Sequence, residues 1–479
     1  MALKPEQEKP ASSIVIPPGF EKFLENVLPL VHTSRDLLPS LNSINSPEAS
    51  ELVEHLSVLH SLELTPEGTS RRDLVLMEDI AGKMAVVVVC RDMNPPQNRD
   101  PAYGELAVIG GLGIYDTPEG ESPLAYALAH TKLLSVIMRR KTWMAGLDLG
   151  GMKGTIPGEF DWEQSIYLQQ AAGFSFSPHG TFTDAITGTD VRQTPDTIAA
   201  MAHGSTIGGD HQIAGMIEAL DTPGSCRFSF DGTYQALRKI YGRKIPALEG
   251  ATVLIEGFGR IGRAAARLML DRGATIILAD PLLTGEDELL PSLPDPEGTK
   301  QFVSNKLQEL TSRYGPDRIQ VVKTTEFATQ PGQVFCPCAG AEGLLTEEKL
   351  RQLAGSGVKV ILSGANNPFG TEKIWERAHL ASRLGIVIPP EILANCGSVT
   401  AAAMEPILRT KMAENPTMTA EKFVAAYVVP HIAQNTQEKL DLLLVVAHQE
   451  NVDLYTAGEI AFRRAFNLPY EIADNTLQE

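Results

Sequence analysis

Two lysines twelve residues apart are the first candidates for chemistry in this chain. Lys141 and Lys153 bound the stretch KTWMAGLDLGGMK, in which small and apolar residues lead to a Gly-Gly pair. A buried ammonium costs free energy unless it meets an anion, and an apolar pocket favours its neutral form. One lysine can therefore bind a carboxylate while the other exchanges protons or activates water. From this segment alone, two exposed lysines flanking a loop remain an open alternative.

A glycine-rich turn forms the second candidate site. Gly257, Gly259 and Gly262 make a GxGxxG pattern, with Arg260 and Ile261 before the last glycine, directly after the apolar run TVLIE. Between a strand and a helix, the first glycine permits a tight turn, the second admits a pyrophosphate and the third allows close packing. The helix N-terminus then presents free N–H groups to the anion. The alternative is that these glycines only close a turn.

The end of the next apolar run bears on the choice of cofactor. TIILAD ends at Asp280, at the distance expected for an acid that binds a ribose 2′-hydroxyl. Such an acid repels a 2′-phosphate, so we predict NAD rather than NADP. Beside a nicotinamide, a lysine pair indicates hydride transfer at the α-carbon of an amino acid.

The elements that must position these residues follow from hydrophobic patterns. Residues 84–90 and 106–111 are short, apolar and β-branched, which predicts strands. Apolar residues recur at helical spacing over 122–140 and predict the helix that leads to Lys141. The segment up to about residue 75 is rich in leucine, and its pattern favours helices.

The order of elements predicts an α/β protein of two domains with a cleft between them. Past about residue 245, strands and helices alternate, which indicates a parallel, Rossmann-type sheet. The acidic, Pro-rich segment 283–299 reads as an exposed insertion. We predict a substrate-binding and oligomerisation domain over 1–215 and an NAD-binding domain over 216–434. Helices in 435–479 are expected to pack back on the first domain.

Bulk composition excludes several classes of partner. The 479-residue chain carries a net charge of −18 and has a pI near 5.1, which argues against binding a phosphate backbone or an anionic membrane. No run of about 18 apolar residues appears. The first residues lack a signal-like apolar core, and five cysteines fit a reducing compartment, so we expect a cytoplasmic location. The Cys336–Pro337–Cys338 spacing is read as an ordinary strand–turn.

The lysine segment resembles a known motif. KTWMAGLDLGGMK is similar to the substrate motif of the glutamate/leucine/phenylalanine/valine dehydrogenase family, and further matches run in family order from about residue 105 to 440. TGTDVRQTPD at 187–196 resembles the loop with the catalytic aspartate, which implies Asp190, with Asp184 as a rival. The resemblance implies NAD contacts at Ser229, Cys338, Ala339, Asn366 and Asn395, with Asn395 also near the substrate.

The resemblance also implies a reaction. Lys141 would bind the substrate carboxylate beside Gly111, Lys153 would activate water, and Asp190 would shuttle protons at the amino group. The products would be a 2-oxo acid and ammonia, formed reversibly and without a metal.

Substrate choice follows from two departures from the glutamate-specific pattern. In glutamate-specific relatives, a lysine binds the side-chain carboxylate of the substrate. That lysine directly precedes a Gly-Gly pair that corresponds to Gly110–Gly111 here. A serine, three residues after the valine of the segment that closes the site, binds the same carboxylate. Here the two positions are Ile109 and, counting from Val399, Ala402. Together with the absent side chain of Gly188, these residues predict a preference for aromatic or long aliphatic amino acids.

Two alternatives stay open. One is a glutamate dehydrogenase, and the other is a catalytically silent homologue that binds nucleotide or amino acid. Family members often carry an arginine two residues after the Gly-Gly pair that corresponds to Gly110–Gly111. Here that position is Gly113, so the arginine is missing. The resemblance implies a homo-oligomer assembled through the N-terminal domain.

Overall fold

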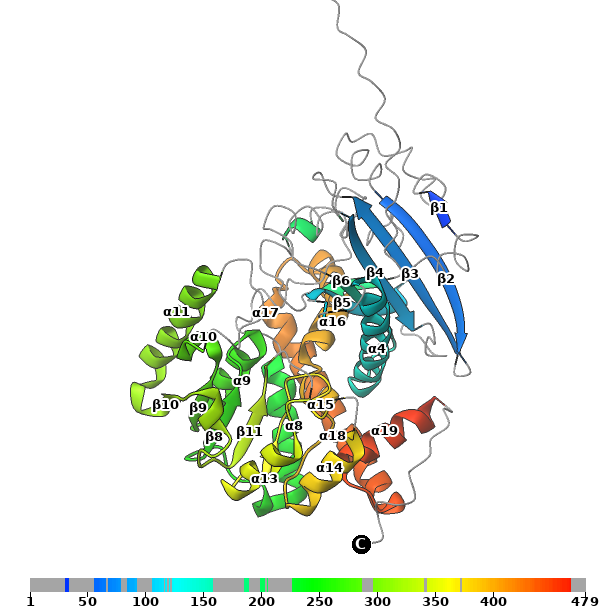
Figure 1. Cartoon of the computed structure of the whole chain (residues 1–479). Coiled ribbons are helices and arrows are strands. Elements are labelled where there is room, and N and C mark those ends of the chain that lie inside the picture. The colour runs from blue at the N-terminus through cyan, green and yellow to red at the C-terminus, as the bar shows by residue number, and fades with distance from the viewer. Residues whose placement is uncertain are drawn as a thin grey trace, which may run out of the picture.

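In its described part, the chain forms two β-sheets joined by helices, as seen in the computed structural model (Figure 1). The structure describes residues 31–33, 56–65, 68–78, 84–92, 106–115, 117–118, 120, 123–157, 185–188, 199–202, 205, 226–286, 296–339, 343–370 and 373–466. None of the described helices is both long enough and apolar enough to cross a membrane.

Among the described residues, the first sheet has seven strands in the order β1-β2-β3-β4-β6-β5-β7. Pairing is antiparallel from β1 through β4 to β6, whereas β5 lies parallel to both β6 and β7. The strands are β1 (Val31–Thr33), β2 (Leu56–Thr65), β3 (Gly68–Glu78), β4 (Met84–Asp92), β5 (Val108–Tyr115), β6 (Gly150–Pro157) and β7 (Ala185–Gly188). The strands predicted over 84–90 and 106–111 are therefore confirmed as β4 and β5.

The helical interpretation of the N-terminal segment was wrong in its described part. Strands β2 and β3 form a long antiparallel ladder there, from Leu56 opposite Met77 to Thr65 opposite Gly68. Leu56, Val58, Leu62 and Leu64 of β2 follow a period of two, which suits a pleated strand, and Leu59 departs from it. Cross-strand pairing with β3 and β4 then decides between the two structures, and this pairing is not visible in a local leucine count.

Helix α4 (Pro123–Met144) connects β5 to β6 and confirms the helix predicted over 122–140. It packs closely on β6, because a Cβ atom added to Gly151 would lie 2.2 Å from the Arg139 backbone nitrogen. The glycine therefore permits helix and strand to approach. This approach fixes the end of α4, where Lys141 lies, over the sheet that carries Lys153.

The second sheet is fully parallel, with the strand order β10-β9-β8-β11-β12. The strands are β8 (Thr252–Glu256), β9 (Thr275–Ala279), β10 (Ile319–Val321), β11 (Val334–Pro337) and β12 (Val360–Ile361). This order is that of a Rossmann-type nucleotide-binding sheet, and confirms the predicted alternation of strands and helices.

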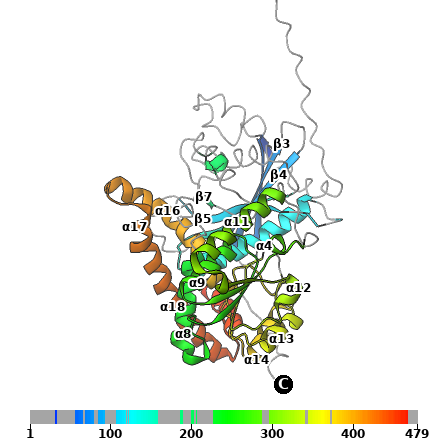
Figure 2. The ribbon, with the colours of Figure 1, turned by 90° about the vertical axis from the view of Figure 1, so that its left-hand side faces the viewer.

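Helices cover both faces of the second sheet, as the turned view shows (Figure 2). On one face lie α8 (Cys226–Tyr241), α9 (Arg260–Asp271) and α11 (Pro296–Tyr314), and on the other α12 (Thr324–Phe327), α13 (Glu347–Gly355) and α14 (Ile374–Arg383). Short helical turns occur at α10 (Pro281–Thr284), Gly242–Lys244 and Pro316–Arg318. The predicted exposed insertion 283–299 thus ends inside α11, while residues 287–295 lie outside the described part.

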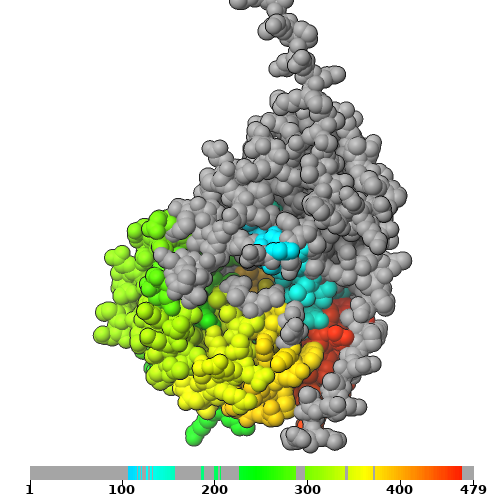
Figure 3. All heavy atoms as spheres, in the orientation of Figure 1, coloured from blue at the N-terminus to red at the C-terminus, as the bar shows by residue number. Residues whose placement is uncertain are grey.

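The C-terminal helices bridge the two halves. They are α15 (Glu391–Ala394), α16 (Gly397–Glu414), α17 (Ala420–Phe423), a π-helical turn (Val424–Val428), α18 (Val429–Glu450) and α19 (Leu454–Ala465). Helix α18 packs mainly against α8 and α19 and also touches α4. In the space-filling view, the red surface of these helices adjoins both the cyan surface near α4 and the yellow surface of the second half (Figure 3). The domain boundaries at 215 and 434 stay a prediction.

Candidate active site

The glycine turn after β8 has the geometry that a dinucleotide needs. Gly257 has a φ of +90°, and a Cβ there would lie 2.7 Å from the Ala339 nitrogen. At Gly262 a Cβ would lie only 1.9 Å from the Gly257 oxygen, so neither position accepts a side chain. At the exposed Gly259, in contrast, a Cβ would meet no protein atom within 4 Å. The open space therefore lies where a pyrophosphate would approach, before the uncapped N-terminus of α9.

Asp280 secures this turn to the end of β9. One carboxylate oxygen accepts the Phe258 N–H at 2.5 Å and the other accepts the Leu282 N–H at 2.9 Å. Burial raises the pKa of Asp280, while the two backbone N–H groups and the nearby Arg263 oppose this shift. Both oxygens therefore already hold backbone groups, and a ribose hydroxyl would share the remaining lone pairs.

The loop after β11 closes around the same turn. Cys336 and Cys338 are both reduced, and burial raises the pKa of each thiol. A Cβ added at Gly364 would lie 2.9 Å from the Cys338 sulfur and 2.5 Å from a methyl group of Ile261, so these segments are in close contact. High thiol pKa values leave these cysteines in the unreactive thiol form. They line the turn as apolar groups.

Lys153 lies in the middle of a row that crosses the first sheet. Its neighbour on β5 is Gly111, and the next residue in the row, on β7, is Gly188. Side chains of adjacent paired residues point to the same face of a sheet, so on the β5 side Lys153 is followed by two positions without a side chain, whereas its neighbour on β4 is Cys90. The lysine is buried, with 5% of its surface exposed. The row two residues earlier brings Ile109 and Ile186 to the same face.

Lys141 reaches from the last turn of α4 to the second half of the molecule. Its Nζ donates to the Asn366 Oδ1 at 3.0 Å, and Asn395 Nδ2 donates to the same oxygen at 3.2 Å. Burial lowers the pKa of Lys141, and the nearby Lys153 acts in the same direction, while Glu391 acts against it. The structure thus brings together the two lysines and both predicted asparagines, from segments more than 200 residues apart.

Ser229 on α8 holds the segment that carries Asn395 in place through hydrogen bonds. The Ser229 hydroxyl is fully buried, donates to the Ala394 carbonyl at 2.6 Å and accepts the Gly397 N–H at 2.9 Å. These bonds hold the start of α16 against α8. A direct contact between Ser229 and a nicotinamide stays a prediction.

Comparison with known proteins agrees with this geometry. Residues 231–461 match the sequence profile of the glutamate/leucine/phenylalanine/valine dehydrogenases, a stretch that includes the glycine turn, Asn366 and Asn395. The chain is similar to that family over this stretch, 231 of its 479 residues. It is 26% identical over 349 residues to a phenylalanine dehydrogenase of Bacillus thermotolerans, covering 72% of this chain and 82% of that protein. It is 27% identical over 358 residues to a valine dehydrogenase of Streptomyces albus, covering 73% and 83%.

Solved structures share the fold of this chain. An L-tryptophan dehydrogenase from Nostoc punctiforme superposes with a TM-score of 0.52 at 18% identity, over 82% of this chain and 95% of the other. A glutamate dehydrogenase superposes with a TM-score of 0.57 at 20% identity, over 94% and 96%. These likenesses confirm the α/β, two-domain architecture with a Rossmann-type sheet.

A hydrophobic cluster lies near the two lysines. Ile109 and Val399 are buried in one hydrophobic cluster, with Ala402 at its edge, and the predicted positions are thus brought together. The other hydrophobic residues of this cluster are Leu106, Met138, Ala145, Leu147, Leu149, Ile186, Cys396, Ala403 and Ile407. Asp190 and its rival Asp184 lie outside the described residues.

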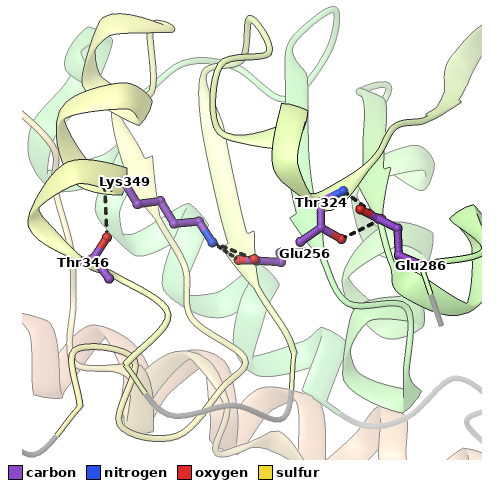
Figure 4. A network of polar contacts seen from close by, with 5 residues as sticks. All are labelled: Glu256, Glu286, Thr324, Thr346 and Lys349. Atoms are coloured by element: carbon purple, nitrogen blue, oxygen red, sulfur yellow. Dashed lines mark hydrogen bonds and ion pairs between the residues drawn. The ribbon is translucent and has the colours of Figure 1, made fainter. Parts of the chain in front are cut away.

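The sequence did not predict the ion pair between Glu256 and Lys349, which lies next to the glycine turn. Lys349 on α13 donates to both carboxylate oxygens of Glu256, at 2.6 and 2.7 Å, and Glu256 is the residue directly before Gly257 (Figure 4). Nearby, Glu286 accepts from the backbone and hydroxyl of Thr324, both at 3.0 Å. The only local signal was a charged residue at the end of an apolar strand. Its partner, 93 residues away, could not be read from that signal.

Proposed function

We propose that this dehydrogenase catalyses the reversible, NAD-dependent oxidative deamination of an apolar L-amino acid to a 2-oxo acid and ammonia. The observation that carries this proposal is the pair of buried lysines at the junction of the two halves, next to an uncharged cluster. The relatives named for phenylalanine and valine support the same substrate class.

Lys141 has the geometry of a carboxylate anchor. A substrate carboxylate can replace the Asn366 oxygen as the partner of its ammonium, and a charge-assisted hydrogen bond in a buried site is strong. Asn395 is well placed beside it, because its Nδ2 already donates to Asn366 while its buried Oδ1 has no hydrogen-bond partner among the residues that the structure describes. That oxygen can accept a hydrogen bond from a ligand.

Lys153 would act on the reacting carbon. Gly111 beside it, and Gly188 one strand further, leave room for a substrate α-carbon and for a water molecule over the sheet. In the proposed mechanism, Lys153 activates that water and hydrogen-bonds the oxygen that forms, while Asp190 moves protons to and from the amino group. Bound NAD supplies the hydride acceptor. The glycine turn and the free N-terminus of α9 fit its pyrophosphate.

Asp190 is preferred to Asp184 because of the direction of β7. This strand ends at Gly188, in the row of Lys153, so Asp190 follows that row by two residues, whereas Asp184 precedes the strand. We expect Asp190→Asn to retain substrate binding and lose most of the turnover rate. Asp184→Asn should be mild by comparison, and the opposite ranking would move the proton shuttle to Asp184.

An apolar substrate is favoured over glutamate. A carboxylate buried against Ile109 and Ala402 without a cation would cost several kcal/mol. Gly188 and Ala402 are small, so a large apolar side chain gains contacts there, whereas a small one would leave a void. Asp280 supports NAD over NADP through its charge at the ribose position. We further propose a cytoplasmic homo-oligomer.

The test is a panel of amino acids with NAD and with NADP, followed by NADH or NADPH absorbance. We expect phenylalanine, tryptophan or leucine to be the best substrates, with NAD the better cofactor. Glutamate as the best substrate would overturn the pocket assignment. No turnover with any amino acid, while NAD still binds, would instead support the silent-homologue alternative.

A further inference from the structure

The helix end that presents Lys141 is closed by a specific set of backbone hydrogen bonds. The Leu147 N–H donates to the Thr142 carbonyl at 2.9 Å, and the Gly146 N–H donates to the Trp143 carbonyl at 3.1 Å. These two bonds define a Schellman end, and Gly146 permits it with a φ of +67°. Such an end satisfies only part of the carbonyl groups in the last turn.

The two remaining carbonyls are satisfied by side chains from α18. The Met144 oxygen accepts from Asn435 Nδ2 at 2.7 Å, and the Ala145 oxygen lies 2.8 Å from His431 Nε2. A carbonyl oxygen can only accept, so the His431 Nε2 must carry the hydrogen in this contact. Helix α18 therefore completes the cap of α4 from a segment 286 residues away in sequence.

One stripe of α18 makes these contacts. His431, Asn435 and Lys439 are spaced four residues apart, so they lie on one side of the helix. The Lys439 ammonium lies 4.0 Å from the centre of the Trp143 ring, in the same turn of α4. Gly146 is required here as well, because a Cβ at this position would lie 2.4 Å from the Asn435 Oδ1.

The neighbouring stripe of α18 packs on the second half of the molecule. Ile432 and Thr436 lie next to Gly232 on α8, where a Cβ would be 3.5 and 3.4 Å from their side-chain atoms. Close packing here joins α18 to the helix that leads into the nucleotide-binding sheet. Helix α18 thus contacts the nucleotide-binding half with one stripe and the Lys141 turn with the other.

We propose that His431 and Asn435 are positioning residues for Lys141. They hold the last turn of α4 in the place from which the Lys141 ammonium reaches Asn366, one turn away from the carbonyls that they bind. The inference rests on the proposed role of Lys141 as the carboxylate anchor. Loss of either donor leaves a carbonyl unsatisfied, and the turn then shifts to find another partner.

The experiment compares His431→Ala and Asn435→Asp with the wild type in the full-length protein. Asn435→Asp is isosteric and keeps the contact with Gly146, but it cannot donate to the Met144 carbonyl. We expect the inhibition constant of 3-phenylpropionate, which carries the carboxylate but no amino group, to rise by about 10- to 100-fold. The Kd for NAD should stay within about twofold, because the glycine turn is on the other half.

Hydrogen exchange supplies a readout that does not depend on activity. The amides of Gly146 and Leu147 should exchange faster in both variants, while those of β8 and β9 keep their wild-type rates. His431→Gln retains an N–H donor and should restore tight inhibitor binding. Gln434→Ala is the matched control, because Gln434 is exposed and bonds only Glu438 within α18 among the interactions the structure describes.

The outcomes are separable. The positioning role would be overturned if the wild type is active on apolar amino acids while the variants keep its inhibition constants and exchange rates. A lower melting temperature with unchanged inhibitor binding would also overturn it and leave a purely structural cap. A wild type that is inactive on every amino acid would refute the proposed function, and faster exchange at Gly146 would still support the positioning of the turn.

Discussion

The ion pair between Glu256 and Lys349 lends itself to a quantitative prediction. Its bonds of 2.6 and 2.7 Å are bidentate, and the side chains keep only 8% and 19% exposure. At an effective dielectric constant of about 20, two unit charges at this distance attract with roughly 6 kcal/mol, most of which offsets their desolvation. Removing one partner of a buried pair costs about 3–5 kcal/mol, and the partial exposure of Lys349 reduces this to about 2–3 kcal/mol.

We therefore expect Glu256→Met and Lys349→Met each to melt about 4–12 °C below the wild type, at about 2–4 °C per kcal/mol. The double variant should be close to the wild type, because a pair of apolar side chains no longer leaves a charge unpaired. Thermal melting at fixed protein concentration measures all three, and NAD titration reports the glycine turn that directly follows Glu256.

An exposed pair supplies the control. Lys306 and Glu309 bond at 2.7 Å on the surface of α11, with 30% and 62% of their side chains exposed. Replacing either should shift the melting temperature by no more than the equivalent of about 1 kcal/mol. The reasoning would be refuted if the Glu256 and Lys349 single variants melted with the wild type, or if the double variant lost the sum of the two single losses.

Three further results are expected. Gly259→Ala should melt like the wild type but bind NAD more weakly. Gly262→Ala should lose both stability and NAD binding, because its Cβ would lie 1.9 Å from the Gly257 oxygen. Calorimetry with and without NAD distinguishes the two variants. Lys153→Ala should abolish turnover while NAD titration stays normal, and near-wild-type activity would contradict its proposed role. Burial lowers the pKa of Lys141, and only its protonated form binds a carboxylate. Inhibition by 3-phenylpropionate should therefore weaken with rising pH before the pH reaches 10.5, the usual pKa of lysine. Inhibition that stays constant up to pH 10.5 would exclude Lys141 as the anchor.

Local patterns predicted the elements that carry strong periodicity or a complete motif. The strand–turn–helix around Gly257 and the helix before Lys141 are confirmed, because each is determined by residues within about twenty positions. The first strands were not predicted, because the spacing of the leucines in β2 is compatible with both a helix and a strand. The pairing of β2 with β3 determines that the segment is a strand. Local periodicity does not contain that pairing.

The candidate site shows the same division. Sequence motifs named Lys141, Lys153 and Asn366 separately, and resemblance gave their roles. The contact between Lys141 and Asn366 joins residues 225 positions apart and depends on how the two halves meet. The α18 cap could not be predicted for the same reason, since His431 gives no local sign that its partner is a carbonyl at the end of α4.

The row Gly111–Lys153–Gly188 constrains the length of the loop between α4 and β6. Side chains of a strand alternate between its two faces, so a change in this loop that shifts the pairing of β6 by one residue would turn Lys153 to the opposite face of the sheet and bring Met152 to its place. A shift by two residues would keep the correct face while moving the lysine along the strand. A shift of the β6 register by an odd number of residues therefore removes the lysine from the site, whereas an even shift leaves a lysine that is misplaced but on the right face.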